Sequence, residues 1–165
     1  MKLFPIEDII ELLQQLNEKQ ADELEGQHLD FKEWNFKSLK DFVDEVIEMA
    51  VCMSNGGGGT VVLGVKDKVI GLDNAIIGVP LDVDVFKLQS TVYDSTDPHL
   101  TPNFESFEYH GKRLLLMHVL SVFPYTTTTG GKGFKRIGKD CKPLTGSMRL
   151  ESDILAGKFD FSVQI

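Results

Sequence analysis

The chain has 165 residues, of which 42% are hydrophobic, and this composition suits one domain with one core. Its net charge of −8 arises within residues 1–50, where 13 Asp and Glu stand against 5 Lys, and the remainder is neutral. This balance excludes a protein that coats nucleic acid non-specifically, although a local basic strip can still bind an anion. No apolar run is long enough to span a membrane, and the start lacks the features of a signal peptide, so we expect a cytoplasmic protein.

The cysteines and histidines give no metal-site pattern. Cys52 and Cys141 lie far apart in the sequence and neither has a CxxC partner, so we expect reduced thiols. The four histidines match no zinc-ligand spacing. His118 is expected to be a hydrogen-bonded core residue rather than a ligand.

The first half of the chain predicts two helices and two strands. Pro5 opens an amphipathic helix, which could pack on the domain or on a second copy, and core packing is the favoured reading. Residues 28–33 predict a strand, and Ser38 is expected to cap a helix that continues to about Ser54. Residues 60–65 predict a buried strand.

Four glycines, Gly56–Gly59, join the second helix to this strand. A phosphate-binding loop instead runs from a strand into a helix and carries a Gly-Lys-Ser/Thr sequence. The order of elements is reversed here and that lysine is missing, so close packing of the backbone is the better explanation.

The second half predicts a short hairpin partner at 70–72, a helix at about 81–94 and a hairpin of strands 103–109 and 113–121. Both faces of 113–121 are apolar, which indicates a central strand. A polar loop at 124–133 is either a disordered surface loop or a lid whose hydroxyls and amides contact phosphates. A strand at 134–138, a helix at 148–156 and an apolar tail at 159–165 follow, and the tail suggests a further C-terminal region.

An acidic corner is predicted around the first strand. Leu29 and Phe31 alternate with Asp30 and Lys32, so the two charged residues should share an open face. Glu25 could turn toward Asp30, and two close carboxylates need a cation, a proton or water between them. The alternative is a solvated strand edge with ordinary charges.

A basic strip lies at 132–149, where one acid, Asp140, accompanies six cations. Arg136 is its strongest anion-binding candidate, because a fixed guanidinium can hold a phosphate with two parallel hydrogen bonds. We expect the acidic corner and this strip to share one exposed surface. The strip contains Lys132, Lys135, Arg136, Lys139, Lys142 and Arg149.

Four separated segments resemble the Schlafen AlbA-type domain, once catalogued as a divergent AAA domain. Residues 25–33, Glu-Gly-Gln-His-Leu-Asp-Phe-Lys-Glu, are similar to its "ES…LEFKE" signature. Residues 50–67 resemble its "AMANTxGGxLLLGVxDxG" element. Pro124-Tyr125 looks like its "KPY", and residues 134–138 look like its "YIRVGS".

The resemblance implies an α/β (α+β) fold with a central, mostly antiparallel mixed sheet packed by helices. Together with the helix pattern at the start, it gives the expected division into an N-terminal amphipathic helix at 1–21, the domain at 22–158 and a tail at 159–165. Bacterial and archaeal members usually lead longer regulator-like proteins and are taken to bind DNA. In animal Schlafen proteins, paired copies of a related domain form a metal-dependent endoribonuclease with three acidic residues. By motif these are Glu25, Asp30 and Asp67, which would hold Mg²⁺ or Mn²⁺.

This sequence departs from the family pattern in three ways. Asp30 replaces the usual Glu, Lys68 follows Asp67, and the chain is acidic where the nuclease form has a broad basic groove. We therefore expect a module of a transcriptional regulator that binds nucleic acid, with DNA favoured over RNA. The alternatives are a metal-dependent endoribonuclease and a dimerisation scaffold, with ATP binding least supported. The predicted phosphate-binding residues are Lys32, Lys132, Lys135, Arg136, Lys139 and Arg149.

Overall fold

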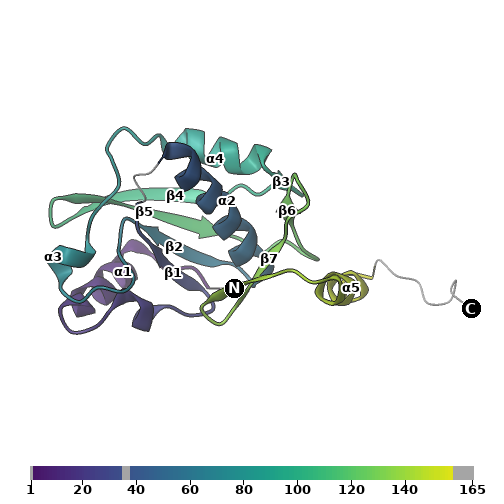
Figure 1. Ribbon diagram of the computed structural model, residues 1–165, viewed down its shortest axis with the longest axis horizontal. Coiled ribbons are helices and arrows are strands. Elements are labelled where there is room, and N and C mark those ends of the chain that lie inside the picture. The colour runs from purple at the N-terminus through teal and green to yellow at the C-terminus, as the bar shows by residue number, and fades with distance from the viewer. Residues whose placement is uncertain (1, 35–37, 158–165) are drawn as a thin grey trace, which may run out of the picture.

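The fold is built on a four-stranded sheet with strand order β1-β2-β5-β4 (Figure 1). A computed structural model describes residues 2–34 and 38–157. Strand β1 pairs with β2 in parallel, while the β2–β5 and β5–β4 pairs are antiparallel. The mixed, mostly antiparallel sheet and the central place of the strand near 113–121 are thus confirmed. The strands are β1 (Leu29–Lys32), β2 (Gly59–Leu63), β4 (Asn103–Tyr109) and β5 (Lys112–Val119).

The main helices begin at identifiable caps. Ser38 accepts a hydrogen bond from the Asp41 amide (3.0 Å) at the start of α2, as predicted. Helix α4 begins later than expected, because the Asp84 carboxylate accepts from the amides of Phe86 and Lys87. The helices are α1 (Ile6–Leu13), α2 (Leu39–Asn55), α3 (Leu72–Ala75), α4 (Val85–Asp94) and α5 (Gly146–Leu155), with short 3₁₀ helices η1 (Gln14–Asn17) and η2 (Ala21–Leu24).

Each face of the sheet has its own apolar core. On β2, Val61 and Leu63 pack with α2 and α4, whereas Val62 packs with α1 and α3 on the opposite face. This division follows from the two-residue period of a strand. Ile9 and Leu13 of α1 are fully buried in the second core, so the first helix packs on the domain as favoured.

The glycine turn after α2 is closely packed, as predicted. A Cβ atom at Gly59 would lie 2.5 Å from the His28 carbonyl oxygen. A Cβ atom at Gly56 would overlap the Arg136 side chain and lie 2.9 Å from the Arg136 carbonyl oxygen. The turn therefore brings the C-terminal end of α2 against the start of β1 and against a strand much later in the chain.

The segment expected at 70–72 as a hairpin strand is instead the approach to α3. Val65, just after β2, forms an antiparallel bridge with Ile76, so the chain pairs back at Ile76 and not at 70–72. Gly71 has φ 105°, a conformation that favours glycine and turns the chain into α3. The prediction was wrong because a three-residue segment, Ile-Gly-Leu, is too short to show the hydrophobic periodicity that distinguishes a strand from a turn.

The C-terminal third adds short strands outside the main sheet. Strand β3 (Thr96–Asp97) pairs with β6 (Thr127–Thr128), and β7 (Phe134–Ile137) forms an antiparallel hairpin with β8 (Asp140–Pro143). The loop at 124–133 is therefore fixed through β6 to β3, which directly follows α4. Helix α5 extends away from the sheet and its covering helices (Figure 1). The predicted tail at 159–165 lies outside the described residues.

The expectation of reduced thiols is wrong for this structure, because Cys52 of α2 and Cys141 of β8 form a disulfide. The sequence did not reveal the pair, because the two cysteines are 89 positions apart and only the fold brings them together. His118 is a buried, hydrogen-bonded residue, as expected: it contacts Thr60 Oγ1 (2.9 Å) and Glu105 Oε1 (2.7 Å).

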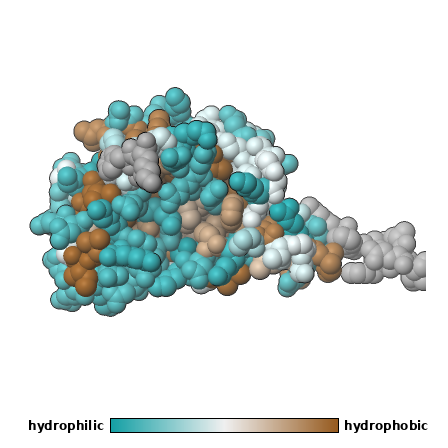
Figure 2. All heavy atoms as spheres, in the orientation of Figure 1, coloured by the Kyte–Doolittle hydropathy of each residue, from teal (hydrophilic) through white to brown (hydrophobic). Residues whose placement is uncertain are grey.

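The face seen in Figure 2 is mostly hydrophilic, with apolar side chains gathered in a few separate patches. Within 2–34 and 38–157, no helix has both the length and the apolar character that a bilayer span requires.

Candidate functional site

The β7–β8 hairpin covers the charged side of β1. Leu29 and Phe31 belong to the core beneath α1, so Asp30 between them points to the opposite side of the sheet. There Arg136 Nη1 lies 3.1 Å from Asp30 Oδ1, and both side chains are nearly inaccessible to solvent. The face that the sequence predicted to be open is therefore closed over Asp30.

The remaining donors of Arg136 bind backbone carbonyls. Nε and Nη2 donate to the Gly26 oxygen at 3.1 and 2.9 Å, and Nη2 also donates to the Leu29 oxygen at 2.8 Å. A buried guanidinium with these partners cannot present a fork to a phosphate. Arg136 thus occupies a structural position, which corrects its expected role as the leading anion-binding residue.

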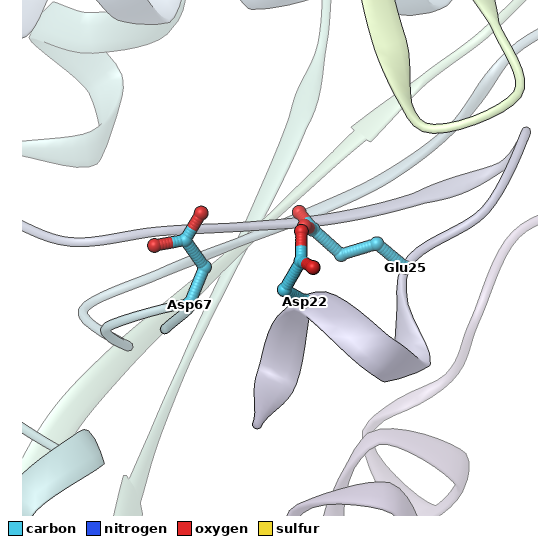
Figure 3. Close-up of side chains that lie close together, drawn as sticks. All are labelled: Asp22, Glu25 and Asp67. Carbon is cyan, nitrogen blue, oxygen red and sulfur yellow. The ribbon is translucent and has the colours of Figure 1, made fainter. Parts of the chain in front are cut away.

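A second group of carboxylates lies beside this ion pair and consists of Asp22, Glu25 and Asp67 (Figure 3). One oxygen of each lies within 4.8 Å of the others, and all three residues are half-buried. Asp22 and Glu25 belong to η2 and its C-terminal cap, while Asp67 follows β2. The Asp22 amide donates to the Asp67 carbonyl oxygen (2.7 Å), which joins the two segments. We call these three residues the acidic cluster.

Glu25 connects the acidic cluster to Asp30. Its Oε2 accepts a hydrogen bond from the Phe31 amide (2.9 Å), which directs the carboxyl group toward β1. Burial, followed by the neighbouring Asp30, raises the pKa of Glu25 to about 9. Asp30 Oδ2 is buried and accepts no hydrogen bond from the part of the chain that is described. With its pKa raised to about 9, Glu25 keeps its proton near neutral pH.

Lysines compensate the outer carboxylates. Lys139, at the turn of the β7–β8 hairpin, lies 3.0 Å from Asp22 Oδ2, and this hydrogen bond lowers the pKa of Asp22. Lys32 lies between Asp30 Oδ2 (3.7 Å) and Glu45 Oε1 (4.0 Å). Both lysines were predicted phosphate ligands, and the structure places both in ion pairs within the chain.

The other predicted cations lie on the outer side of the C-terminal region. Lys135 is the cross-strand partner of Lys142, and Arg136 is the partner of Cys141. Since Arg136 and Cys141 face the body of the domain, Lys135 and Lys142 face away from it. Lys132 is exposed, and Arg149 donates to the Gly131 oxygen (3.1 Å) near the Tyr125 ring. We call Lys132, Lys135, Lys142 and Arg149 the cationic ribbon.

Sequence reasoning missed two residues of these groups. Asp22 was hidden in a polar segment without a strand or helix period, although its spacing of three from Glu25 fits one turn of a 3₁₀ helix. Lys142 belonged to the basic strip but was not selected as a ligand, because β8 was not predicted. Conversely, Asp30 is not a member of the acidic cluster; Asp22 occupies that place.

Comparison with a solved structure supports the fold. The DIP2311 protein from Corynebacterium diphtheriae superposes with a TM-score of 0.69 at 21% identity, over 90% of this chain and 31% of that chain. The chain thus spans about a third of the length of that relative. The N-terminal domain of a RecG-related protein from Nitrosomonas europaea gives a TM-score of 0.46 at 23% identity, over 79% of this chain and 88% of that domain.

The sequence comparison identifies the family. No functionally curated protein matches the sequence. Residues 25–145 match the model of the Schlafen AlbA_2 family, and this range contains β1, the glycine turn and the β7–β8 hairpin. These elements carry Asp30 and Arg136, and the match covers most of the chain, so the chain belongs to the Schlafen AlbA_2 family.

Proposed function

We propose that this domain binds the phosphate backbone of nucleic acid, with duplex DNA as the first ligand to test, through the cationic ribbon. The observation that carries the proposal is the direct cross-strand pairing of Lys135 with Lys142. Like charges opposite each other destabilise a strand pair, so this arrangement favours a bound anion. In the described part of the chain, no carboxylate lies within ion-pair distance of either ammonium group.

The neighbouring side chains extend the same positive surface. Lys132 precedes β7 and is exposed, and the guanidinium of Arg149 is held near Gly131 and the Tyr125 ring. Four cations on one hairpin and its flanks supply contacts to several phosphates. Contacts of this kind give affinity and salt dependence without reading the base sequence.

The acidic half of the molecule restricts the orientation of such a ligand. Residues 1–50 carry the whole net charge of −8. Phosphates are repelled from this region, so the backbone is expected to follow the cationic ribbon and to avoid α1 and the outer face of α2. The family resemblance, in which bacterial and archaeal members are taken to bind DNA, supports DNA over RNA.

A salt titration with paired variants tests the proposal. Binding of a short labelled duplex is measured by fluorescence anisotropy for the wild type and for Lys135→Ala/Lys142→Ala. The double variant should bind more weakly. The slope of its log K plotted against log salt concentration should be smaller in magnitude by about 2, because each lost phosphate contact reduces that slope by about 0.9. Lys87→Ala/Lys112→Ala removes the same charge from exposed positions outside the ribbon and serves as the control. Equal losses of affinity in both double variants, or no binding by the wild type, would reject the proposal that the cationic ribbon binds the phosphate backbone.

Metal-dependent cleavage of nucleic acid is the second candidate, and the acidic cluster favours it. Three carboxylates within 4.8 Å offer the oxygen ligands that Mg²⁺ and Mn²⁺ prefer, so the donor set fits such an ion. Asp22, Glu25 and Asp67 would hold it. When bound, the ion would activate water and offset charge on a phosphate. Glu25 must first lose its proton, and Lys139 must release Asp22, so binding is weak near neutral pH.

The cleavage candidate has a separate test. The purified protein is incubated with structured RNA and Mn²⁺, and Mn²⁺ binding is followed in parallel by calorimetry. Asp67→Asn should abolish both signals, whereas Asp73→Asn, an exposed acid of α3, should leave both unchanged. Cleavage that survives in Asp67→Asn would assign the activity to a contaminant or to another site.

A further inference from the structure

The disulfide connects two parts of the fold that have different exposure. Cys52 lies in the buried face of α2 and is 0% exposed, whereas Cys141 lies on β8 and is exposed. The bond fastens the β7–β8 hairpin, which carries Arg136, Lys135 and Lys142, to the main helix of the domain.

Strand β7 has several other attachments to the domain. Arg136 binds Asp30, Asn55 Nδ2 donates to the Phe134 oxygen (2.7 Å), and Gln27 Nε2 donates to the Arg136 oxygen (2.7 Å). These contacts do not depend on the disulfide. Strand β7 is therefore expected to remain in place when the disulfide is broken.

Strand β8 is attached differently. Within the described residues, the backbone hydrogen bonds of Asp140–Pro143 go to β7, and no ion pair joins this strand to another element. Cys141 supplies its bond to α2, where its sulfur also contacts Met49 Sδ at 3.7 Å. Apart from its pairing with β7, β8 is thus anchored to the domain chiefly by the disulfide, and β8 carries Lys142 of the cationic ribbon.

The two sulfurs differ in their accessibility to a reductant. A groove of about 240 Å³ borders Cys141 and is also lined by Lys32, Glu45, Glu48, Met49 and Phe134. Cys52 has no exposed surface. Thiol–disulfide exchange requires a thiolate to reach the sulfur that it attacks. An external thiolate can therefore reach Cys141 from solvent.

From this geometry we infer that Cys141 is the attack site for a dithiol reductant, and that the Cys52–Cys141 bond is a reversible switch that anchors or releases β8. The first thiolate of the reductant bonds to Cys141 Sγ, and Cys52 Sγ leaves with the electron pair and takes a proton. The second thiolate of the reductant then displaces Cys141, which also takes a proton. The reductant becomes a disulfide, and the protein gains two electrons and two protons.

The effect on nucleic acid rests on the proposed function. In the reduced domain, the disulfide no longer fixes β8 and its Lys142 to α2, while Lys135 stays on the anchored strand β7. The cationic ribbon then loses its fixed spacing, and binding of a phosphate backbone weakens because the mobile strand must be ordered again.

Hydrogen exchange in the oxidised and reduced protein tests the switch without reference to nucleic acid. The full chain is treated with dithiothreitol or left oxidised, and exchange is followed by mass spectrometry. Residues 140–143 should lose protection on reduction and regain it with glutathione disulfide, while β5 stays protected in both states. A brief dithiothreitol pulse trapped with acid should give the mixed disulfide at Cys141. Unchanged exchange at 140–143, trapping at Cys52, or purified protein without the disulfide under oxidants would overturn the proposal.

Two further measurements separate this proposal from the proposed function. Cys52→Ala/Cys141→Ser should show the exchange pattern of the reduced wild type in both redox states; if this variant does not fold, the reduced wild type alone decides. Binding of a labelled duplex is then compared between the oxidised and reduced wild type. A change in exchange without duplex binding in either state supports the switch and rejects the binding function. Equal duplex binding with equal exchange rejects the switch and retains the binding function.

Discussion

Arg136 Nη1 lies 3.1 Å from Asp30 Oδ1 in the interior of the domain, although 106 residues separate the two in the sequence. This ion pair links β1, which carries the first family motif, to β7, which carries the last. It also decides which charged residues can contact a ligand. Asp30 and Arg136 are internal, whereas the acidic cluster and the cationic ribbon stay accessible.

Arg136→Ala should lower the free energy of unfolding by about 3–5 kcal/mol, because it removes the buried partner of the Asp30 carboxylate and leaves only the more distant Lys32 ammonium group. Chemical denaturation of the variant and the wild type measures this difference. Lys135→Ala, the adjacent cation on the outer face, should change stability by no more than about 0.5 kcal/mol. Similar effects of the two substitutions would show that the internal ion pair does not stabilise the fold.

Stability should fall as the pH rises, because Glu25 holds its proton more tightly in the folded chain. Its folded pKa of about 9 lies above the ordinary value of 4.5. The stabilisation is therefore complete below about pH 4.5 and is lost as the pH rises through about 9. Glu25→Gln, which stays neutral and can still donate to Asp30, should flatten this dependence. Melting temperatures of both proteins across this range provide the measurement, and parallel curves would contradict a raised pKa.

Gly56→Ala should destabilise the domain by roughly 1–3 kcal/mol, since the added methyl group would overlap the Arg136 side chain. The effect is steric, because the φ of Gly56 is −90°, which other residues adopt. Gly146→Ala is the matched control: a Cβ atom at Gly146 would have no neighbour within 4 Å. Thermal unfolding compares the two variants, and an unchanged melting temperature for Gly56→Ala would show that the hairpin can shift away from α2.

Lys139→Met should strengthen Mn²⁺ binding by the acidic cluster, because it removes the ammonium group that competes for Asp22. Binding should also tighten between pH 7 and pH 9 in both proteins, as Glu25 loses its proton. Electron paramagnetic resonance of unbound Mn²⁺ measures the affinity. Lys112→Met, an exposed lysine at the start of β5, is the control for the lost charge. Equal affinities for both variants and the wild type would place any Mn²⁺ elsewhere.

The local sequence was sufficient for most of the secondary structure and for the order of the core faces. The alternation of Leu29, Asp30 and Phe31 correctly separated the two sides of β1, and the apolar faces of 113–121 identified the central strand. Ser38 marked the start of α2, and the order of helix, glycine turn and strand correctly argued for close packing. These features depend on neighbouring residues, whose spacing fixes the direction of each side chain.

The tertiary structure decided what covers each face and which distant residues meet. A strand period shows that Asp30 and Phe31 point in opposite directions, but it does not show that Arg136 covers Asp30. The addition of Asp22 to the acidic cluster, the pairing of Lys135 with Lys142 and the Cys52–Cys141 bond likewise depend on contacts between separate segments. Such contacts are set by the packing of the whole chain and have no local period, so the sequence determined the elements and their faces while the fold determined the site.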